Sequence, residues 1–319
     1  MFALINEFTE DNLLLHFKSI LKIFVDKYGC KFFKTQDLLN NNGNLKKYIL
    51  DTYDELPLYI ITFYGIGSFC PIINEINSIG IKLIIIADDI HHSSRLAVHR
   101  IPVFKKCFKS FNTYAYELNK WNLPKINNNY FFPHSANWII DFNENPISKI
   151  LVSGSINPIY PDREYVANLK NKNIEVLKLD TKNNIWGENF YKYLNKYLCC
   201  FVDTPRDYIL AKVFEICASG SLLLCMNPTL LDIFEQLGFK DNMNYISCTR
   251  ENLFEKIDYI VDPSNKSIID NIRKEGHKLI KEKHNINHRA DTLFNILIDN
   301  FKLTEKTNSS LGINYYLAF

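Results

Sequence analysis

The chain has 319 residues, of which 47% are hydrophobic and 23% charged. These are the values of a globular protein, and the length suits two domains of about 150 residues each. The formal net charge is only +2, from 37 basic and 35 acidic side chains. A protein that binds the phosphates of nucleic acid needs a larger basic excess, so we expect no nucleic-acid partner.

Two further features concern the cell compartment. The eight cysteines show no Cys-x-x-Cys spacing and several lie in apolar runs, which indicates reduced, mostly buried thiols. No apolar run reaches the ~18 residues of a membrane span. The N-terminal residues include acidic side chains where a signal peptide has basic ones. We therefore expect a cytoplasmic protein with no membrane span.

The first half of the chain alternates between helix and strand patterns. In chain order, these patterns predict a helix over 12–27, a strand over 58–64, a helix over 71–78, a strand over 81–87, and weaker strands over 108–116 and 130–132. Apart from Lys82, the run 81–87 is apolar, as in a strand whose two faces are both covered.

After a polar stretch at 143–146, the alternation begins again. Strands are predicted over 149–153, 174–179, 198–202, 221–225 and 245–247, and helices over 164–171, 186–196, 210–218, 230–236, 253–261, 266–283 and 288–300. Strands that alternate with helices predict a parallel α/β sheet.

The alternation therefore predicts an α/β protein of two Rossmann-like domains that face a cleft. We place the N-terminal domain at 1–145 and the C-terminal domain at 146–301, with a hinge near 143–148. The tail, 302–319, is expected to pack back on the N-terminal domain or to stay loose. Ligands of such sheets bind at the carboxyl ends of the strands, so the loops that follow the strands are the first places to look for a site.

The richest of these loops follows the third predicted strand of the C-terminal half. It contains Arg206 and Asp207, and a helix predicted to begin near Tyr208 places Lys212 and Glu215 one turn apart on one face. The free N–H groups and positive dipole of a helix start suit a diphosphate, and a carboxylate suits the two hydroxyls of a ribose. From the spacing alone, an exposed ion pair between the lysine and the glutamate is an equally good explanation.

Two other positions in this half suit phosphate. Gly154, followed by Ser155, comes directly after a predicted strand, and a glycine there lets the backbone approach a phosphate closely. Arg163 could neutralise a diphosphate through two parallel hydrogen bonds. An ordinary strand-end turn and a solvated arginine are the alternatives for these two positions.

The segment VFEICASG at 213–220, followed by a buried strand, resembles the donor-binding segment of GT-B glycosyltransferases. The resemblance is specifically to the spore-maturation-type "glycosyl transferases group 1" family. Further matches to that family follow in the same order: Gly154-Ser155 with the Tyr160–Arg163 loop, Leu237-Gly238-Phe239, Glu251-Asn252-Leu253, and the closing His284–Arg289 segment. Together they extend over residues 149–296, close to half of the chain.

This resemblance implies the GT-B fold and transfer of a sugar from a nucleoside-diphosphate sugar, with UDP-sugars favoured. The acceptor would be a hydroxyl on a glycan, a protein or a small molecule. Helix N-termini and basic side chains generally stabilise the leaving diphosphate in such sites, so we expect no metal and no cofactor. Retaining members of the wider superfamily carry two glutamates at a fixed spacing. Asp207 and Glu215 have that spacing, but the aspartate leaves the stereochemical outcome open.

The N-terminal half supplies candidates for the acceptor side. Asp88 and His91 directly follow the strongest predicted strand, where they could act as a general base. A structural loop and a metal site are the alternatives there. Gly65 and Gly67 are interpreted as a loop that makes room for an acceptor or for a closing phosphate. His134 could bind a sugar hydroxyl, or it could be a core histidine with its hydrogen bonds satisfied.

Two other functional classes fit the same layout. A sugar-nucleotide or glycan-binding module that has lost catalysis would keep the donor site. A nicotinamide-dependent oxidoreductase also uses paired α/β domains, but the chain lacks the three-glycine fingerprint of dinucleotide-binding proteins.

Overall fold

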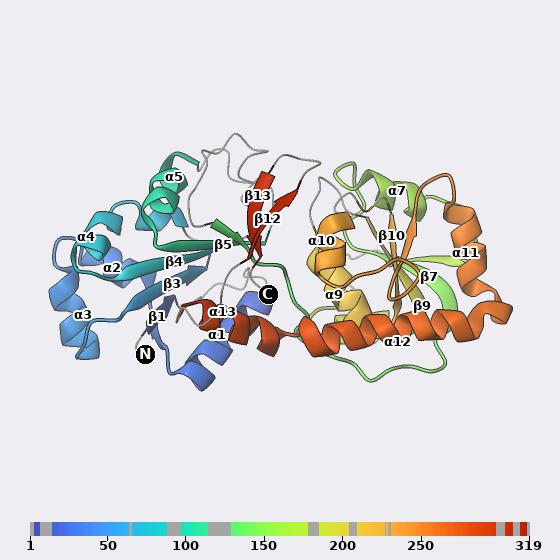
Figure 1. Cartoon of the computed structure of the whole chain (residues 1–319), viewed down its shortest axis with the longest axis horizontal. Coiled ribbons are helices and arrows are strands. Elements are labelled where there is room, and N and C mark those ends of the chain that lie inside the picture. The colour runs from blue at the N-terminus through green and yellow to red at the C-terminus, as the bar shows by residue number, and fades with distance from the viewer. Residues whose placement is uncertain are drawn as a thin grey trace. The chain divides into compact units, whose positions relative to one another are not determined.

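The computed structural model describes residues 3–6, 15–63, 66–87, 97–113, 129–177, 185–203, 209–226, 228, 231–297, 304–308 and 313–317. The chain divides into two compact units, the first of Met1–Pro133 with Arg289–Phe319 and the second of His134–His288. Both are shown in Figure 1. These limits differ from the domain boundary expected at 145/146, and two sets of contacts described below account for the difference.

The first unit is built on an eight-stranded sheet of order β12-β13-β6-β5-β4-β3-β1-β2. Its strands are β1 (Ala3–Asn6), β2 (Lys31–Phe33), β3 (Tyr59–Phe63), β4 (Lys82–Ala87), β5 (Lys109–Asn112), β6 (Asn129–Phe131), β12 (Thr304–Asn308) and β13 (Ile313–Leu317). All neighbouring strands run parallel except the antiparallel pair β12–β13. The tail strand β13 pairs with β6, so the C-terminal residues extend the sheet of this unit.

Helices cover both faces of this sheet. They are α1 (Leu15–Tyr28), α2 (Thr35–Asn40), α3 (Leu45–Tyr53), α4 (Ile73–Ser78), α5 (Ala97–Lys106) and α13 (Ile286–Leu297), with a 3₁₀ turn η1 (Ile66–Phe69). One cluster of buried side chains joins β3 and β4 to α2, α3, α4 and α5. On the other face, the ring of Phe17 of α1 lies 5.3 Å from the ring of Phe63 of β3. Coverage on both faces explains why β3 and β4 are almost wholly buried and, apart from Thr62 and Lys82, apolar.

The helix α13 joins the first unit through contacts with α1. Asp291 accepts hydrogen bonds from Lys27 and Tyr28, and the rings of Tyr28 and Phe294 stack at 3.8 Å between centroids. The hydroxyl of Tyr59 donates to the carbonyl of Leu297 at 2.7 Å. These contacts place the chain from residue 289 onward in the first unit, although the sequence pattern continues the C-terminal alternation to 300.

The second unit contains a five-stranded, fully parallel sheet of order β11-β10-β9-β7-β8. Its strands are β7 (Ile147–Ser153), β8 (Ile174–Leu177), β9 (Tyr197–Asp203), β10 (Leu222–Met226) and β11 (Ile246–Cys248). From β7 the chain steps to β8 on one side and then returns past β7 to β9 on the other. The strand order therefore reverses between β7 and β9, and the open end of that junction is where ligands of such sheets bind.

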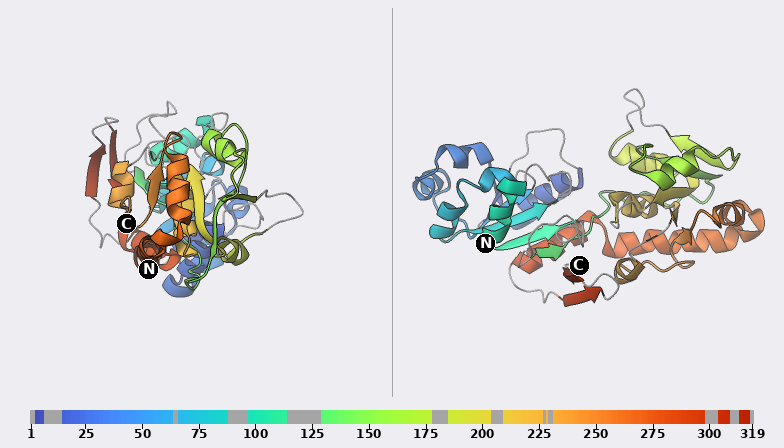
Figure 2. Two further views of the ribbon diagram at one scale, coloured as in Figure 1. Left: turned by 90° about the vertical axis from the view of Figure 1, so that its right-hand side faces the viewer. Right: turned by 90° about the horizontal axis from the view of Figure 1, so that it is seen from above.

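Helices cover both faces of this second sheet as well. They are α7 (Pro161–Ala167), α8 (Glu188–Leu194), α9 (Ala211–Ala218), α10 (Leu231–Gln236), α11 (Leu253–Val261) and α12 (Lys266–Lys283), with a 3₁₀ turn η4 (Pro263–Asn265). Side chains of α7, α11 and α12 pack with β7, β9, β10 and β11 in one buried cluster. The 18-residue helix α12 also packs on α9 (Figure 2).

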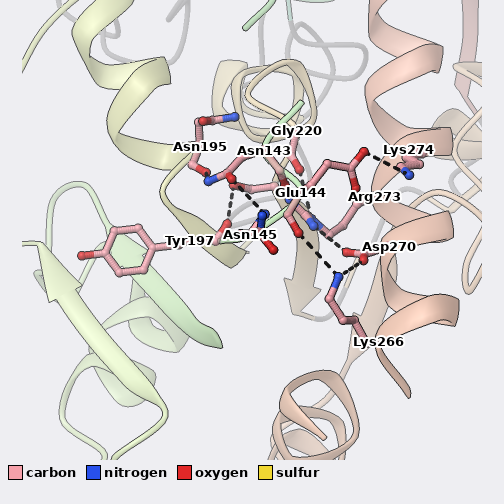
Figure 3. A network of polar contacts seen from close by, with 11 residues as sticks. Asn143, Glu144, Asn145, Asn195, Tyr197, Gly220, Lys266, Asp270, Arg273 and Lys274 are labelled. Carbon is pink, nitrogen blue, oxygen red and sulfur yellow. Dashed lines mark hydrogen bonds and ion pairs between the residues drawn. The ribbon is translucent and has the colours of Figure 1, made fainter. Parts of the chain in front are cut away.

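The segment before β7 is hydrogen-bonded into the second unit. Buried Arg273 of α12 donates from Nε to the carbonyl of Gly220 at 3.1 Å and from Nη2 to the carbonyl of Asn143 at 2.9 Å. The side-chain amide of Asn143 donates to the carbonyl of Asn195 at 3.0 Å (Figure 3). Because these bonds tie residues near 143 to α12 and to the end of α8, this stretch belongs to the unit that follows it. The segment predicted as a hinge, 143–148, therefore begins at a residue that is hydrogen-bonded to the second unit.

Candidate functional site

The second unit brings polar side chains together where its strand order reverses. Ser153 is the last residue of β7 and Asp203 is the last residue of β9, its neighbour in the sheet. Both side chains are buried. The strand predicted from the sequence ends at Val202 and leaves out Asp203, although an acidic residue at the end of the wholly apolar run YLCCFV was a usable signal.

Gly154 follows β7 with φ +104°, a conformation that favours glycine. A methyl group added there would lie 2.5 Å from Nζ of Lys212 and 3.0 Å from Nη1 of Arg163. The two cations therefore approach the backbone of Gly154 from two different helices, α9 and α7. The close approach of a phosphate predicted at this glycine stays a prediction, because the groups that lie near it here are the side chains of Lys212 and Arg163.

Arg163 is held by Asp203. Its Nη2 donates to Oδ1 of Asp203 at 2.6 Å, its backbone N–H donates to Oδ2 at 3.2 Å, and both side chains are almost fully buried. Its Nη1 donates to the carbonyl of Ser155 at 3.1 Å. The charge of Arg163 is thus already balanced, so the direct contact with a diphosphate expected from the sequence does not fit this geometry. The pair instead fixes the loop that follows Gly154.

Lys212 lies in the first turn of α9, which begins at Ala211, three residues later than the start predicted near Tyr208. Its Nζ donates to the carbonyl of Ser153 at 2.6 Å and to the Ser153 hydroxyl at 3.3 Å. Burial, together with the charge of Arg163, lowers the pKa of Lys212 to about 8, and the charge of Glu215 opposes this shift. A partly desolvated ammonium beside a helix N-terminus suits an anionic group.

Glu215 lies one turn after Lys212 on the same helix and is half-buried. Burial raises the pKa of its carboxyl, and the charge of Lys212 opposes that shift. No described residue donates a hydrogen bond to this carboxylate. The exposed ion pair that spacing alone allowed is therefore absent among the described contacts, and the carboxylate is open to hydroxyl groups of a ligand.

Two residues near Glu215 were not predicted from the sequence. Tyr191 of α8 is buried, and its hydroxyl oxygen accepts the backbone N–H of Asn137 at 3.2 Å. Burial raises the pKa of Tyr191, and the charge of Glu215 raises it further. The side-chain oxygen of Asn137 is buried without a hydrogen-bond partner. No sequence signal marked either residue, because they come from a helix and an irregular segment far apart in the chain.

Comparison with solved structures establishes the fold. HepE of Anabaena, solved in complex with UDP-glucose, has a TM-score of 0.59 at 8% identity over 94% of this chain and 100% of that one. A glycosyltransferase of Rickettsia africae has a TM-score of 0.56 at 12% identity over 93% of this chain and 98% of that one. The protein has the GT-B fold. The fold class predicted from the sequence, with two Rossmann-like domains, is confirmed.

A sucrose-phosphate synthase of Thermosynechococcus elongatus shares the GT-B fold at a TM-score of 0.54 and 10% identity, over 85% of this chain and 81% of that one. No protein-family model and no curated protein matches the sequence. At these identities the likeness establishes architecture, and the activity has to be argued from the site.

Several residues predicted from the sequence fall outside the described part of this GT-B chain. They are Arg206, Asp207 and Tyr208 on the donor side, and Gly65, Asp88 and His91 on the acceptor side. Gly67 lies in η1, where its carbonyl accepts from Cys70 N–H at 3.1 Å. His134 is buried and is the first residue of the second unit.

The described residues contain neither a group of side chains suited to hold a metal ion nor a helix suited to cross a membrane. Within those ranges, no three or more histidine, cysteine, aspartate or glutamate side chains are grouped so as to hold a metal ion. Among the described helices, none combines the length and the apolar character needed to cross a membrane.

Proposed function

We propose that the protein is a glycosyltransferase that moves a sugar from a nucleoside-diphosphate sugar, with UDP-sugars favoured, to a hydroxyl acceptor. The observation that carries the proposal is the arrangement of Lys212 and Glu215 beside Gly154, where the strand order of the second sheet reverses. It supplies a cation for a diphosphate and, one helical turn away, a carboxylate without a partner for a ribose. The similarity to three GT-B structures supports it, one of them solved with UDP-glucose.

The proposed mechanism stabilises the leaving diphosphate electrostatically. As the bond between the sugar and the phosphate breaks, negative charge grows on the phosphate oxygens. The N-terminus of α9 and the ammonium of Lys212 would oppose that negative charge, and the guanidinium of Arg206 would supply further positive charge. Arg163 and Asp203 contribute by holding the loop after Gly154 in place, which keeps the donors preorganised. The residues of the first unit proposed for the acceptor are Gly65, Gly67, Asp88 and His91, to which His134 is added from the second unit.

Metal independence is part of the proposal. The basic groups and the helix N-terminus supply the positive charge that a divalent ion would otherwise bring. We expect transfer to continue in EDTA. Complete loss of activity that Mn²⁺ or Mg²⁺ restores would instead point to a bound metal, with Asp88 as a first candidate ligand.

We also propose that the protein works in a reducing compartment such as the cytoplasm. All eight cysteines are free, and six of them are buried. Burial raises the pKa of Cys107 and Cys200 to about 12 in each case. Thiols of this kind are core residues and are typical of proteins that do not depend on disulfides.

The proposal is tested by nucleotide binding and transfer with the full chain. A thermal-shift screen of UDP, GDP, ADP, CDP, CMP and NAD identifies the ligand, and calorimetry then compares wild type with Glu215→Ala. Loss of hydrogen bonds to a charged group should weaken binding by ~1.5–3 kcal/mol. Glu255→Ala, an exposed glutamate on α11, is the control.

Three outcomes count against the proposal. Unchanged affinity in Glu215→Ala contradicts the ribose role. Binding of NAD alone favours an oxidoreductase. Nucleotide binding without transfer or donor hydrolysis favours a non-catalytic sugar-nucleotide or glycan-binding module.

A further inference from the structure

Three polar groups from three parts of the second unit each have hydrogen-bonding capacity that no described group uses. The carboxylate of Glu215 on α9 has no described hydrogen-bond donor. The hydroxyl of Tyr191 on α8 accepts from Asn137 N–H, but no described group accepts its own proton. The side-chain oxygen of Asn137 is buried and has no partner. The contact between Asn137 and Tyr191, the packing of α8 on α9, and the effect of Glu215 on the pKa of Tyr191 link the three groups.

Burying the Tyr191 hydroxyl and the Asn137 oxygen with unused hydrogen-bonding capacity is costly, because a buried donor or acceptor that loses water without a new partner destabilises the fold. The ring of Tyr191 is also held in place, with the ring of Trp138 at 5.4 Å in a T-shaped contact. A fixed ring cannot turn its hydroxyl toward solvent. The arrangement therefore suits a site whose partner arrives with a ligand.

The chemistry of the three groups restricts that ligand. Two of them, the carboxylate and the amide oxygen, only accept hydrogen bonds, which disfavours a phosphate. The third offers a proton, which disfavours a simple cation. Neighbouring hydroxyl groups fit, because each hydroxyl can donate one hydrogen bond and accept others.

We propose that Tyr191 and Asn137 complete the hydroxyl site that Glu215 begins, and that together they make the protein select ribonucleotides over deoxyribonucleotides. In this arrangement Glu215 and the side-chain oxygen of Asn137 accept protons from the ribose hydroxyls, and Tyr191 donates to one of the ribose oxygens. This inference rests on the proposed function, since it assumes that the ligand is a nucleotide. Tyr191 and Asn137 act as specificity residues distinct from the groups that oppose the diphosphate charge.

The test compares one nucleoside diphosphate with its analogues. The best-bound of UDP, GDP, ADP and CDP is titrated by calorimetry beside its 2′-deoxy and 3′-deoxy forms, with wild type, Tyr191→Phe and Asn137→Ala. Wild type should prefer the ribonucleotide over at least one deoxy form by about 10- to 100-fold, the value of hydrogen bonds to a charged group. Each variant should shrink that preference by about 3- to 10-fold, the value of one neutral hydrogen bond.

Tyr193→Phe is the matched control. It lies two residues away on the same helix, and its hydroxyl contacts Tyr197 at 3.3 Å. We expect it to leave the preference unchanged. Thermal unfolding of all variants separates a lost ligand contact from a loss of stability, because Tyr191→Phe keeps the ring against Trp138. A lower Tm with an unchanged preference would assign Tyr191 to structure alone.

The outcomes distinguish this inference from the proposed function. If no nucleotide binds the wild type, the proposed function fails and this inference fails with it. If a nucleotide binds and Glu215→Ala weakens it, but neither Tyr191→Phe nor Asn137→Ala alters the ribose preference, only this inference is overturned, and a water molecule satisfies these groups instead.

Discussion

Arg163 and Asp203 form an ion pair of 2.6 Å whose side chains are 4% and 2% exposed. The pair joins the start of α7 to the end of β9, two elements that flank the loop after Gly154. A buried pair has few other partners available, so removing one member leaves the other charged and unpaired. The position of the loop that follows Gly154 therefore depends on the ion pair between Arg163 and Asp203.

The first prediction concerns this pair. Asp203→Ala should lower the free energy of unfolding by about 3–5 kcal/mol, because it leaves the buried charge of Arg163 without its ion-pair partner. Urea denaturation measures the change. The control is Glu188→Ala, which removes an exposed pair with Lys192 whose side chains are 47% and 57% exposed, and which should cost less than about 1 kcal/mol. Equal losses in the two variants would contradict the structural role given to Asp203.

The second prediction concerns Gly154. Gly154→Ala and Gly80→Ala both place a methyl group on a backbone of positive φ, +104° and +82°, so both should lose about 1–3 kcal/mol of stability. Only the methyl group at position 154 would collide with Lys212, since no atom lies within 4 Å of a methyl group placed at position 80. Gly154→Ala alone should therefore weaken nucleotide binding, by about tenfold, as expected for one displaced charged contact. Calorimetry on both variants checks this. Equal nucleotide affinities in the two variants would show that Gly154 does not belong to the nucleotide site.

The third prediction is a pH dependence. Burial and Arg163 hold the pKa of Lys212 near 8, so its positive charge is present below that pH and lost above it. Affinity for a nucleoside diphosphate should therefore fall as pH rises from 8 to 10, by at most about tenfold per unit because one proton is linked. Lys212→Arg stays charged throughout and should flatten the profile. A wild-type profile that is already flat would contradict the role of Lys212.

The same group makes a prediction about stability. The pKa of Lys212 is lower in the folded protein than its ordinary value of 10.5. Between pH 8 and 10.5 the unfolded chain therefore binds the extra proton, and the contribution of Lys212 to stability rises with pH across that window. The difference in unfolding free energy between wild type and Lys212→Met should show this slope, since methionine does not titrate. Parallel pH profiles for the two proteins would show that Lys212 is not desolvated.

The fifth prediction concerns the acceptor base. Asp88 and His91 come directly after the residues of the buried strand β4 in the sequence. Asp88→Asn or His91→Ala should lower transfer about 10²–10⁴-fold, the usual size of general-base catalysis, while donor affinity barely changes. Turnover and calorimetry on the same preparations separate the two effects. If both variants keep near-normal turnover, the reaction uses another base or retains configuration, and Asp207 becomes the residue to test.

Local patterns in the sequence were sufficient for most of the architecture. The apolar run 81–87 became β4, and the run 149–153 became the core of β7, because strands covered on both faces need continuous apolar residues. The helical spacing that places Lys212 and Glu215 on one turn is likewise local. The segments 31–33 and 35–53 were missed because they are short and only partly apolar, and tertiary packing rather than periodicity determines whether such pieces fold as β2, α2 and α3.

Only the tertiary structure decided which of these residues meet. Asp203 reaches Arg163 across 40 residues because the chain returns from β8 past β7, so that β9 pairs with the other side of β7. Asp291 reaches Tyr28 across 263 residues, and Asn137 reaches Tyr191 across 54. The hydrophobic pattern determines whether a segment is a strand or a helix, since that depends on neighbours within a few residues. The order of the strands in a sheet, and the packing of α13 against α1, depend on burying the apolar faces of all strands and helices together. That requirement is a property of the whole chain.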